Sequence, residues 1–89
     1  MPSYLIETYL ARGQAGERAR HERRARSAAA ELARKHVIVR VERSIYVPED
    51  EICFFVIEAP SSRDAALVAE HAGLDPSRIV EALPSETEA

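Results

Sequence analysis

The most distinctive pattern in the chain is the stretch Glu51–Ala59, in which both phases of an every-second-residue alternation are mostly apolar. Successive side chains of a strand point to opposite faces of its sheet. One phase carries Ile52, Phe54, Val56 and Glu58, and the other carries Cys53, Phe55, Ile57 and Ala59. Because neither set suits water alone, we expect this strand at the centre of a sheet with cover on both faces.

Two other stretches alternate like strands that pair with this central one. Tyr4–Leu10 is rich in β-forming residues, and its two predicted faces are Leu5, Glu7 and Tyr9 against Tyr4, Ile6, Thr8 and Leu10. Val37–Val47 has Val37, Val39, Val41, Ile45 and Val47 on one predicted face, interrupted by Arg43, and Ile38, Arg40, Glu42, Ser44 and Tyr46 on the other. The turn Pro48–Asp50 predicts a hairpin between the second stretch and the central strand.

Two stretches have helical periodicity instead. Steps of about 100° per residue along Gln14–Lys35 predict a long helix. Its inward stripe is Arg18, His21, Ala25, Ala28, Ala29, Leu32 and His36. A second helix is predicted to begin at the capping-box sequence Ser61–Asp64 and to end at Gly73 in a left-handed cap. Its inward stripe is Ala65, Val68, Ala69 and Ala72.

With a fourth strand over Ser77–Leu83, the order of the predicted elements is βαββαβ. Right-handed crossovers fold this order into a four-stranded antiparallel sheet with two helices on one face, the ferredoxin-like arrangement of the α+β class. The first and third strands are then central. We expect residues 1–83 to form one domain and the acidic residues 84–89 to be a disordered tail.

Charge and hydropathy narrow the classes of protein that fit this fold. No apolar run approaches the roughly 20 residues that a membrane-spanning helix needs. The segment Met1–Glu7 lacks the basic region of a secretory signal, so we expect a cytoplasmic protein. Eight of the 12 Lys and Arg residues fall in Arg12–Lys35, against three of the 15 acids. The first helix is therefore basic on an acidic chain, and the absence of aromatic residues from it disfavours nucleic-acid binding.

The face of the sheet away from the helices is also predicted to be partly apolar. A second copy of the chain is the simplest cover for such a face, which predicts a homodimer in the form of an α/β sandwich or barrel. Mixed polar and apolar side chains on this face predict a ligand cleft between the two sheets. The cleft residues are Glu7, Tyr9, Arg40, Glu42, Ser44, Tyr46, Phe54 and Glu58.

A family resemblance supports the same architecture. It rests on Tyr46–Asp50, Cys53–Pro60, Ala72–Leu74 and Arg78–Glu81. These segments resemble the small, mostly uncharacterised bacterial ferredoxin-like domains, a family that includes a streptomycete nickel-binding protein. The resemblance implies a dimer, and nickel is the cofactor that it suggests. Because the nickel-binding relatives tend to carry histidine just before the Tyr-Val pair, where this chain has Ser44, we carry over no metal ligands and expect no bound cofactor.

Few other residues are candidates for chemistry. Glu17 and His21 lie one helical turn apart and His36 follows the helix, which makes these three a weak metal-binding set. Cys53 is the only cysteine, and its place in an apolar strand predicts a small buried side chain rather than a nucleophile.

Three functional classes remain open from the sequence. We favour a dimeric, non-catalytic module that binds a small ligand or a metal or has a regulatory role. The first alternative is a cofactor-independent monooxygenase or isomerase that uses Tyr9, Tyr46 or Glu58. The second is an interaction protein that uses the basic first helix.

Overall fold

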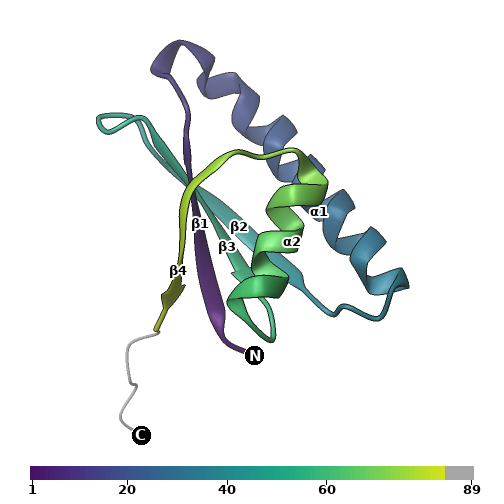
Figure 1. The fold of residues 1–89 in the computed structure, drawn as a ribbon. Coiled ribbons are helices and arrows are strands. Elements are labelled where there is room, and N and C mark those ends of the chain that lie inside the picture. Colours follow the sequence, from purple (N-terminus) through teal and green to yellow (C-terminus); the bar gives the residue numbers. More distant parts are fainter. Residues whose placement is uncertain (84–89) are drawn as a thin grey trace, which may run out of the picture.

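The computed structural model describes residues 1–83, and the predicted acidic tail at 84–89 lies outside them. The elements are β1 (Ser3–Tyr9), the 3₁₀ helix η1 (Arg12–Glu17), α1 (Arg18–Arg34), β2 (Arg40–Val47), β3 (Ile52–Glu58), α2 (Ser62–Ala72) and β4 (Pro76–Ala82). The strands form one antiparallel sheet in the order β2-β3-β1-β4 (Figure 1). The predicted ferredoxin-like fold, with β1 and β3 central, is confirmed.

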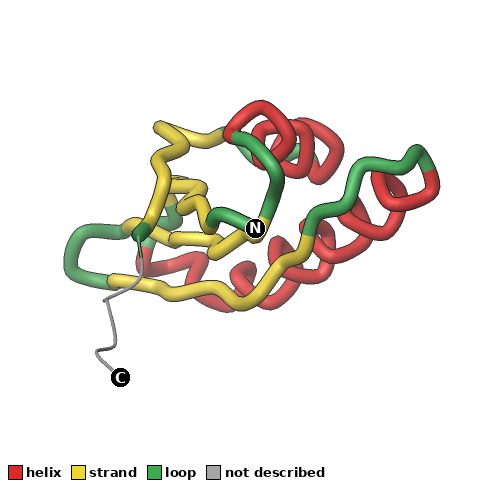
Figure 2. Tube along the Cα trace, turned by 90° about the horizontal axis from the view of Figure 1, so that it is seen from below, coloured by secondary structure: helices red, strands yellow, loops and turns green. Residues whose placement is uncertain are grey.

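Both helices lie on one side of the sheet, and no helix of the described chain covers the other side (Figure 1). The strands cross one another at an angle, as expected from the right-handed twist of β-sheets (Figure 2). The sheet therefore has a helix-covered face and an uncovered face, which we call the open face.

The core fills the space between the helices and the sheet. Its largest fully buried side chains are Phe55, Ile6, Leu32, Ile57, Val68 and Cys53. Three of these six come from β3, which agrees with its predicted central place. On α1 the buried positions are Ala25, Ala28, Ala29 and Leu32, and on α2 they are Ala65, Val68, Ala69 and Ala72. These residues are the apolar members of the predicted inward stripes, which are thus confirmed. The small alanine side chains let each helix lie close to the sheet.

The first helix starts later than its periodicity predicted. Residues Arg12–Glu17 form a 3₁₀ helix that is interrupted at Gln14, whose backbone has φ −116° and ψ 19°. Glycine at positions 13 and 16 weakens α-helix propensity in this stretch. Regular α-helix begins only at Arg18, so the predicted start at Gln14 was wrong by four residues.

The caps of the second helix follow the prediction. The Oγ atom of Ser61 accepts a hydrogen bond from the backbone N–H of Asp64 over 3.2 Å. At the other end Gly73 has φ 71°, and the N–H of Leu74 donates to the carbonyl of Ala69 over 2.9 Å. Only glycine adopts this left-handed conformation without steric cost, so Gly73 ends α2 and redirects the chain toward β4.

The second strand departs most from the prediction. It begins at Arg40 rather than Val37, and its pairing with β3 shifts between Val41 and Arg43. Val41 pairs with Ile57 and Arg43 pairs with Val56, so Glu42 is the additional residue of a β-bulge. Because one extra residue inverts the alternation, every side chain after Glu42 faces the opposite side of the sheet from the one predicted.

Candidate functional site

The open face is the candidate functional surface. Paired residues of antiparallel strands share a face of the sheet, so the register defines its members. They are Ser3, Leu5, Glu7 and Tyr9 of β1, Arg40, Arg43, Ile45 and Val47 of β2, Ile52, Phe54, Val56 and Glu58 of β3, and Arg78, Val80 and Ala82 of β4. Most are apolar, and the predicted open-face positions of Glu7, Tyr9, Arg40, Phe54 and Glu58 are confirmed.

Apolar side chains form a continuous floor across the strands. Leu5 pairs with Val56 on one side and with Val80 on the other, and Ile45 pairs with Phe54 in the neighbouring row. Val56 is only 8% exposed although no described helix covers it, because its neighbours on the open face surround it. Ile45, on the edge strand, is 42% exposed. The floor is thus a broad apolar surface in contact with solvent in the single chain.

Two ion pairs lie on the open face, one in the same row as Phe54 and the other in the row at one end of the sheet. Glu7 of β1 lies 2.6 Å from the Nε of Arg78 on β4, and Glu58 of β3 lies 3.1 Å from the Nε of Arg40 on β2. Each pair links neighbouring strands, and each carboxylate is less exposed than its arginine partner. Cross-strand pairs of this kind contribute about 0.2–1 kcal/mol each. They are also consistent with the alternation of polar and apolar groups at the rim of a binding surface.

The bulge removes two of the predicted cleft residues from this face. Ser44 pairs with Phe55 and Tyr46 pairs with Cys53, so both point toward the helices. The hydroxyl of Tyr46 donates to the carbonyl of Leu10 over 2.8 Å, and partial burial raises the pKa of this phenol. The predictions for Ser44 and Tyr46 were therefore wrong, and Tyr46 is not available as a base on the open face.

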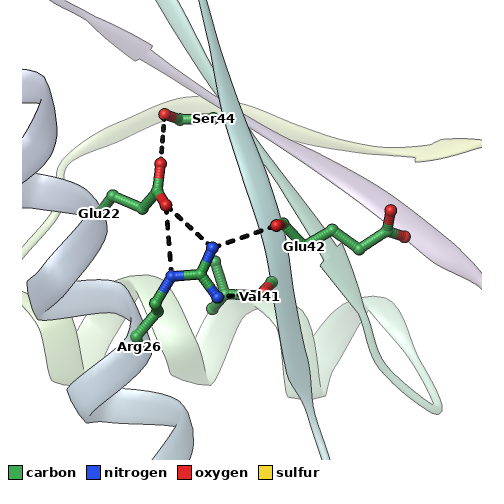
Figure 3. A network of polar contacts seen from close by, with 5 residues as sticks. All are labelled: Glu22, Arg26, Val41, Glu42 and Ser44. Atoms are coloured by element: carbon green, nitrogen blue, oxygen red, sulfur yellow. Dashed lines mark hydrogen bonds and ion pairs between the residues drawn. The ribbon is translucent and has the colours of Figure 1, made fainter.

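The third cleft residue predicted on this part of β2, Glu42, lies at the bulge itself, where an arginine of α1 contacts the strand (Figure 3). The guanidinium of Arg26 donates to the carbonyl of Val41 over 2.7 Å and to the carbonyl of Glu42 over 3.1 Å. The side chain of Glu42 points away from this contact (Figure 3). The bulge leaves Glu42 without a partner on β3, so the register assigns it to neither face and its place in the cleft stays a prediction.

Glu22 completes this network from the preceding turn of α1. Its carboxylate accepts from the Ser44 hydroxyl over 2.6 Å and from the Arg26 Nη2 over 2.9 Å. The hydrogen bond from Ser44, followed by that from Arg26, lowers the pKa of Glu22 below its ordinary value. The network fixes the bulge, and the bulge fixes which β2 side chains reach the open face.

The sequence reasoning missed several open-face residues on the two edge strands. Arg43, Ile45 and Val47 replace Ser44 and Tyr46 on β2. The one available signal was Arg43, a charged residue within an otherwise apolar phase, because a bulge at that point resolves the irregularity. Arg78 and Val80 on β4 were missed because the register of that strand against β1 was not predicted.

The two remaining candidates for enzyme chemistry lie at opposite ends of the open face. Tyr9 pairs with Ile52 and Glu58 pairs with Ser3, six residues apart along β1, which corresponds to about 20 Å. Tyr9 is 66% exposed, and its hydroxyl donates to the Oε1 of Glu51 over 3.3 Å. Tyr9 and Glu58 of one chain therefore do not converge on a common reacting atom.

The weak metal-binding set does not assemble into a site. Glu17 is paired with Arg20 at 3.0 Å. His21 is in the first turn of α1 and His36 lies two residues past the end of α1 at Arg34, so the helix alone spans about 20 Å between them. No three His, Cys, Asp or Glu side chains within residues 1–83 gather closely enough to hold a metal ion. The prediction that grouped Glu17, His21 and His36 was wrong in its geometry.

Cys53 faces the helices and is fully buried, as its place in the strand predicted. Burial raises the pKa of its thiol. Because the thiolate is the nucleophilic form, burial leaves Cys53 as a packing residue.

Comparisons with known proteins identify the fold. No family model matches the sequence, and no curated protein matches it. Among solved structures, SCO4226 from Streptomyces coelicolor A3(2) superimposes with a TM-score of 0.73 at 16% sequence identity. The match covers 94% of this chain and 99% of that protein, so the two share essentially the whole fold. Separately, no helix within residues 1–83 is both long enough and apolar enough to cross a membrane.

Proposed function

We propose that this protein is a homodimeric, non-catalytic binding module whose two open faces pack against each other and hold a small ligand between them. The observation that carries the proposal is the apolar floor of the open face, which has members on all four strands and whose one carboxylate on central strand β1, Glu7, is neutralised by Arg78. A surface of this kind is unusual on a small monomer and typical of an interface.

A second copy of the chain is the occupant that best fits this face. A two-fold axis places the same patch on both partners, so a self-complementary apolar floor needs no other chain. The ion pairs Glu7–Arg78 and Glu58–Arg40 form within one chain, so neither needs a charged group from the second copy. Two twisted sheets that pack face to face touch along one diagonal and diverge toward the corners, which leaves room for a ligand.

Arg43 suggests the chemistry of that ligand. It is an exposed side chain beside Val56, and it makes no ion pair with any residue in the described part of the chain. A guanidinium next to apolar side chains favours a molecule with an apolar body and one carboxylate. The proposed ligand class is therefore a small apolar organic acid.

Calorimetry with phenylacetate and its neutral amide tests this ligand class. We expect the tag-free protein to bind the acid more tightly than the amide, and Arg43→Gln to remove that preference. The matched control is Arg34→Gln, an exposed arginine at the end of α1 that is outside the open face. Equal affinities for acid and amide in the unmodified protein would refute the proposed role of Arg43.

A further inference from the structure

A second hollow lies on the helical side of the molecule, between α1 and α2. It is a groove of about 590 Å³ and is independent of the open face. Its lining comprises Arg20, Arg23, Arg24, Ser27, Ala28 and Glu31 of α1, with Glu70, His71, Ala72 and Gly73 at the end of α2. The groove exists because side chains at its floor, such as Ser27, Ala28 and Gly73, are too small to fill the space between the helices.

The basic and acidic residues that α1 contributes to the groove are separated along its length. Arg20, Arg23 and Arg24 belong to the first half of α1, and Glu31 follows Arg24 by seven residues, or about 10 Å. The guanidinium of Arg24 lies over Gly73 and donates to its carbonyl over 3.5 Å. The arginine end of the groove is thus beside the end of α2.

These arginines retain donors for a ligand. Arg20 is engaged by Glu17 at 3.0 Å, and Arg24 makes one long contact to Gly73. Arg23 is exposed and forms no ion pair with the described residues. Because each guanidinium presents five N–H donors, most of the donors at this end are open to a carboxylate.

The separation of charge indicates the kind of partner. A nucleic acid carries a phosphate at every step, so a strand along the groove would bring phosphates beside Glu31 at one end and beside Glu70 near the arginine end. The lining contains no Phe, Tyr or Trp for base stacking, and its one aromatic ring is the imidazole of His71. A peptide can instead place carboxylates at one end only and a basic or neutral residue at the other. We infer that the α1–α2 groove binds a peptide segment of a partner protein that carries acidic residues at the arginine end.

Short apolar residues add a second element of recognition. Ala28 and Ala72 line the floor between the charged rims, so an apolar side chain of the peptide has a place to pack. The groove is on the helical side, and the open face is on the opposite side of the sheet (Figure 1). A dimer formed through the open faces would leave both grooves accessible. The inference does not depend on the dimer or on the small ligand.

Fluorescence anisotropy with an array of short synthetic peptides tests the inference. The peptides differ in the number of glutamates at one end and in whether the other end carries lysine or glutamate. We expect affinity to rise with glutamates at one end and to fall when the opposite lysine becomes glutamate. Single-stranded DNA of matched length and inorganic phosphate serve as competitors, and neither is expected to displace the best peptide.

Charge reversal in the protein locates the site. Arg23→Glu is expected to weaken the best peptide about tenfold or more, equal to about 1.4 kcal/mol. The same peptide with its glutamates replaced by lysines should then regain affinity for the variant. Arg34→Glu, at an exposed α1 position outside the groove, is the matched control and should leave affinity within a factor of about two. Equal losses in both variants, DNA that binds more tightly than every peptide, or no binding by any peptide would each overturn the inference.

Discussion

At the scale of single residues, Arg26 has the widest consequence for the proposed site. Its guanidinium contacts the carbonyls of Val41 and Glu42 at the bulge and donates to Glu22, whose carboxylate also accepts from Ser44. A bulge leaves backbone groups without partners in the strand ladder. By satisfying two of them from α1, Arg26 stabilises the inverted alternation that brings Arg43 and not Ser44 to the open face.

This network predicts a pH dependence of stability. Hydrogen bonds from Ser44 and Arg26 lower the pKa of folded Glu22, so folding favours its ionised form. That contribution is complete above the pKa of the unfolded state and is lost as the pH falls through the lower pKa of the folded state. Below about pH 4.5, the difference in unfolding free energy between the wild type and Glu22→Gln should therefore shrink.

Urea denaturation at a series of pH values measures this difference. Glu22→Gln keeps one acceptor oxygen for Arg26 and places its NH2 group beside the Ser44 hydroxyl, which can accept from it, so the main change is the loss of charge. Glu49→Gln, at an exposed position of the β2–β3 turn, is the control variant. A gap between the wild type and Glu22→Gln that stays constant from neutral to acidic pH would show that the Glu22 charge does not act as described.

Whether the chain binds nickel tightly also depends on individual residues. His21 and His36 are too far apart to share an ion, and Ser44, in place of an imidazole, donates to Glu22. We therefore expect nickel to bind the tag-free chain more weakly than about 1 µM, which corresponds to roughly −8 kcal/mol. Calorimetry that finds tighter binding at one ion per chain, lost on His21→Ala or His36→Ala, would contradict this expectation.

At the scale of elements, the sequence predicts what local patterns encode. The sequence predicted the alternation of β1 and β3, the alanine stripes and the caps at Ser61 and Gly73, because each depends on near neighbours in the chain. It did not predict the β2 bulge. It depends on contacts between Arg26 and the strand 15 and 16 residues later, which exist only after α1 has packed on the sheet.

The same limit applies to the candidate site. Five of its eight predicted residues lie on the open face. Four of them belong to β1 and β3, which have no bulge in their mutual pairing, and the fifth, Arg40, comes before the bulge in β2. The other three, Glu42, Ser44 and Tyr46, are at or after the bulge. The α1–α2 groove was invisible for a similar reason, since it needs the end of α2 beside the first half of α1.

The packing of α1 gives a test at this scale. Leu32 is 2% exposed against the sheet, whereas Ala30 on the same helix is exposed. Leu32→Asp places an unpaired charge in the core and is expected to lower the free energy of unfolding by at least about 3 kcal/mol. Ala30→Asp adds the same side chain to the surface and should cost less than about 1 kcal/mol. Equal melting temperatures for the two variants would show that the buried and exposed faces of α1 have been assigned wrongly.

At the scale of the whole molecule, the chain has two chemically different sides. The helical side carries most of the basic residues, with eight Lys or Arg against three acids between Arg12 and Lys35. The opposite side of the sheet is the apolar open face. The account assigns the apolar side to self-association around a small ligand and the charged groove to an acidic segment of a partner. Such a division would let one protein hold two kinds of partner without competition.

Light scattering on tag-free protein at micromolar concentration tests self-association through the open face. We expect a mass of twice 9.9 kDa, about 20 kDa. Ile45→Glu, on the open face, is expected to give a folded monomer. The matched variant Ile38→Glu changes an isoleucine that is 56% exposed but lies before β2, and it should remain dimeric. A wild-type mass of 9.9 kDa, or a dimer that survives Ile45→Glu, would contradict the account.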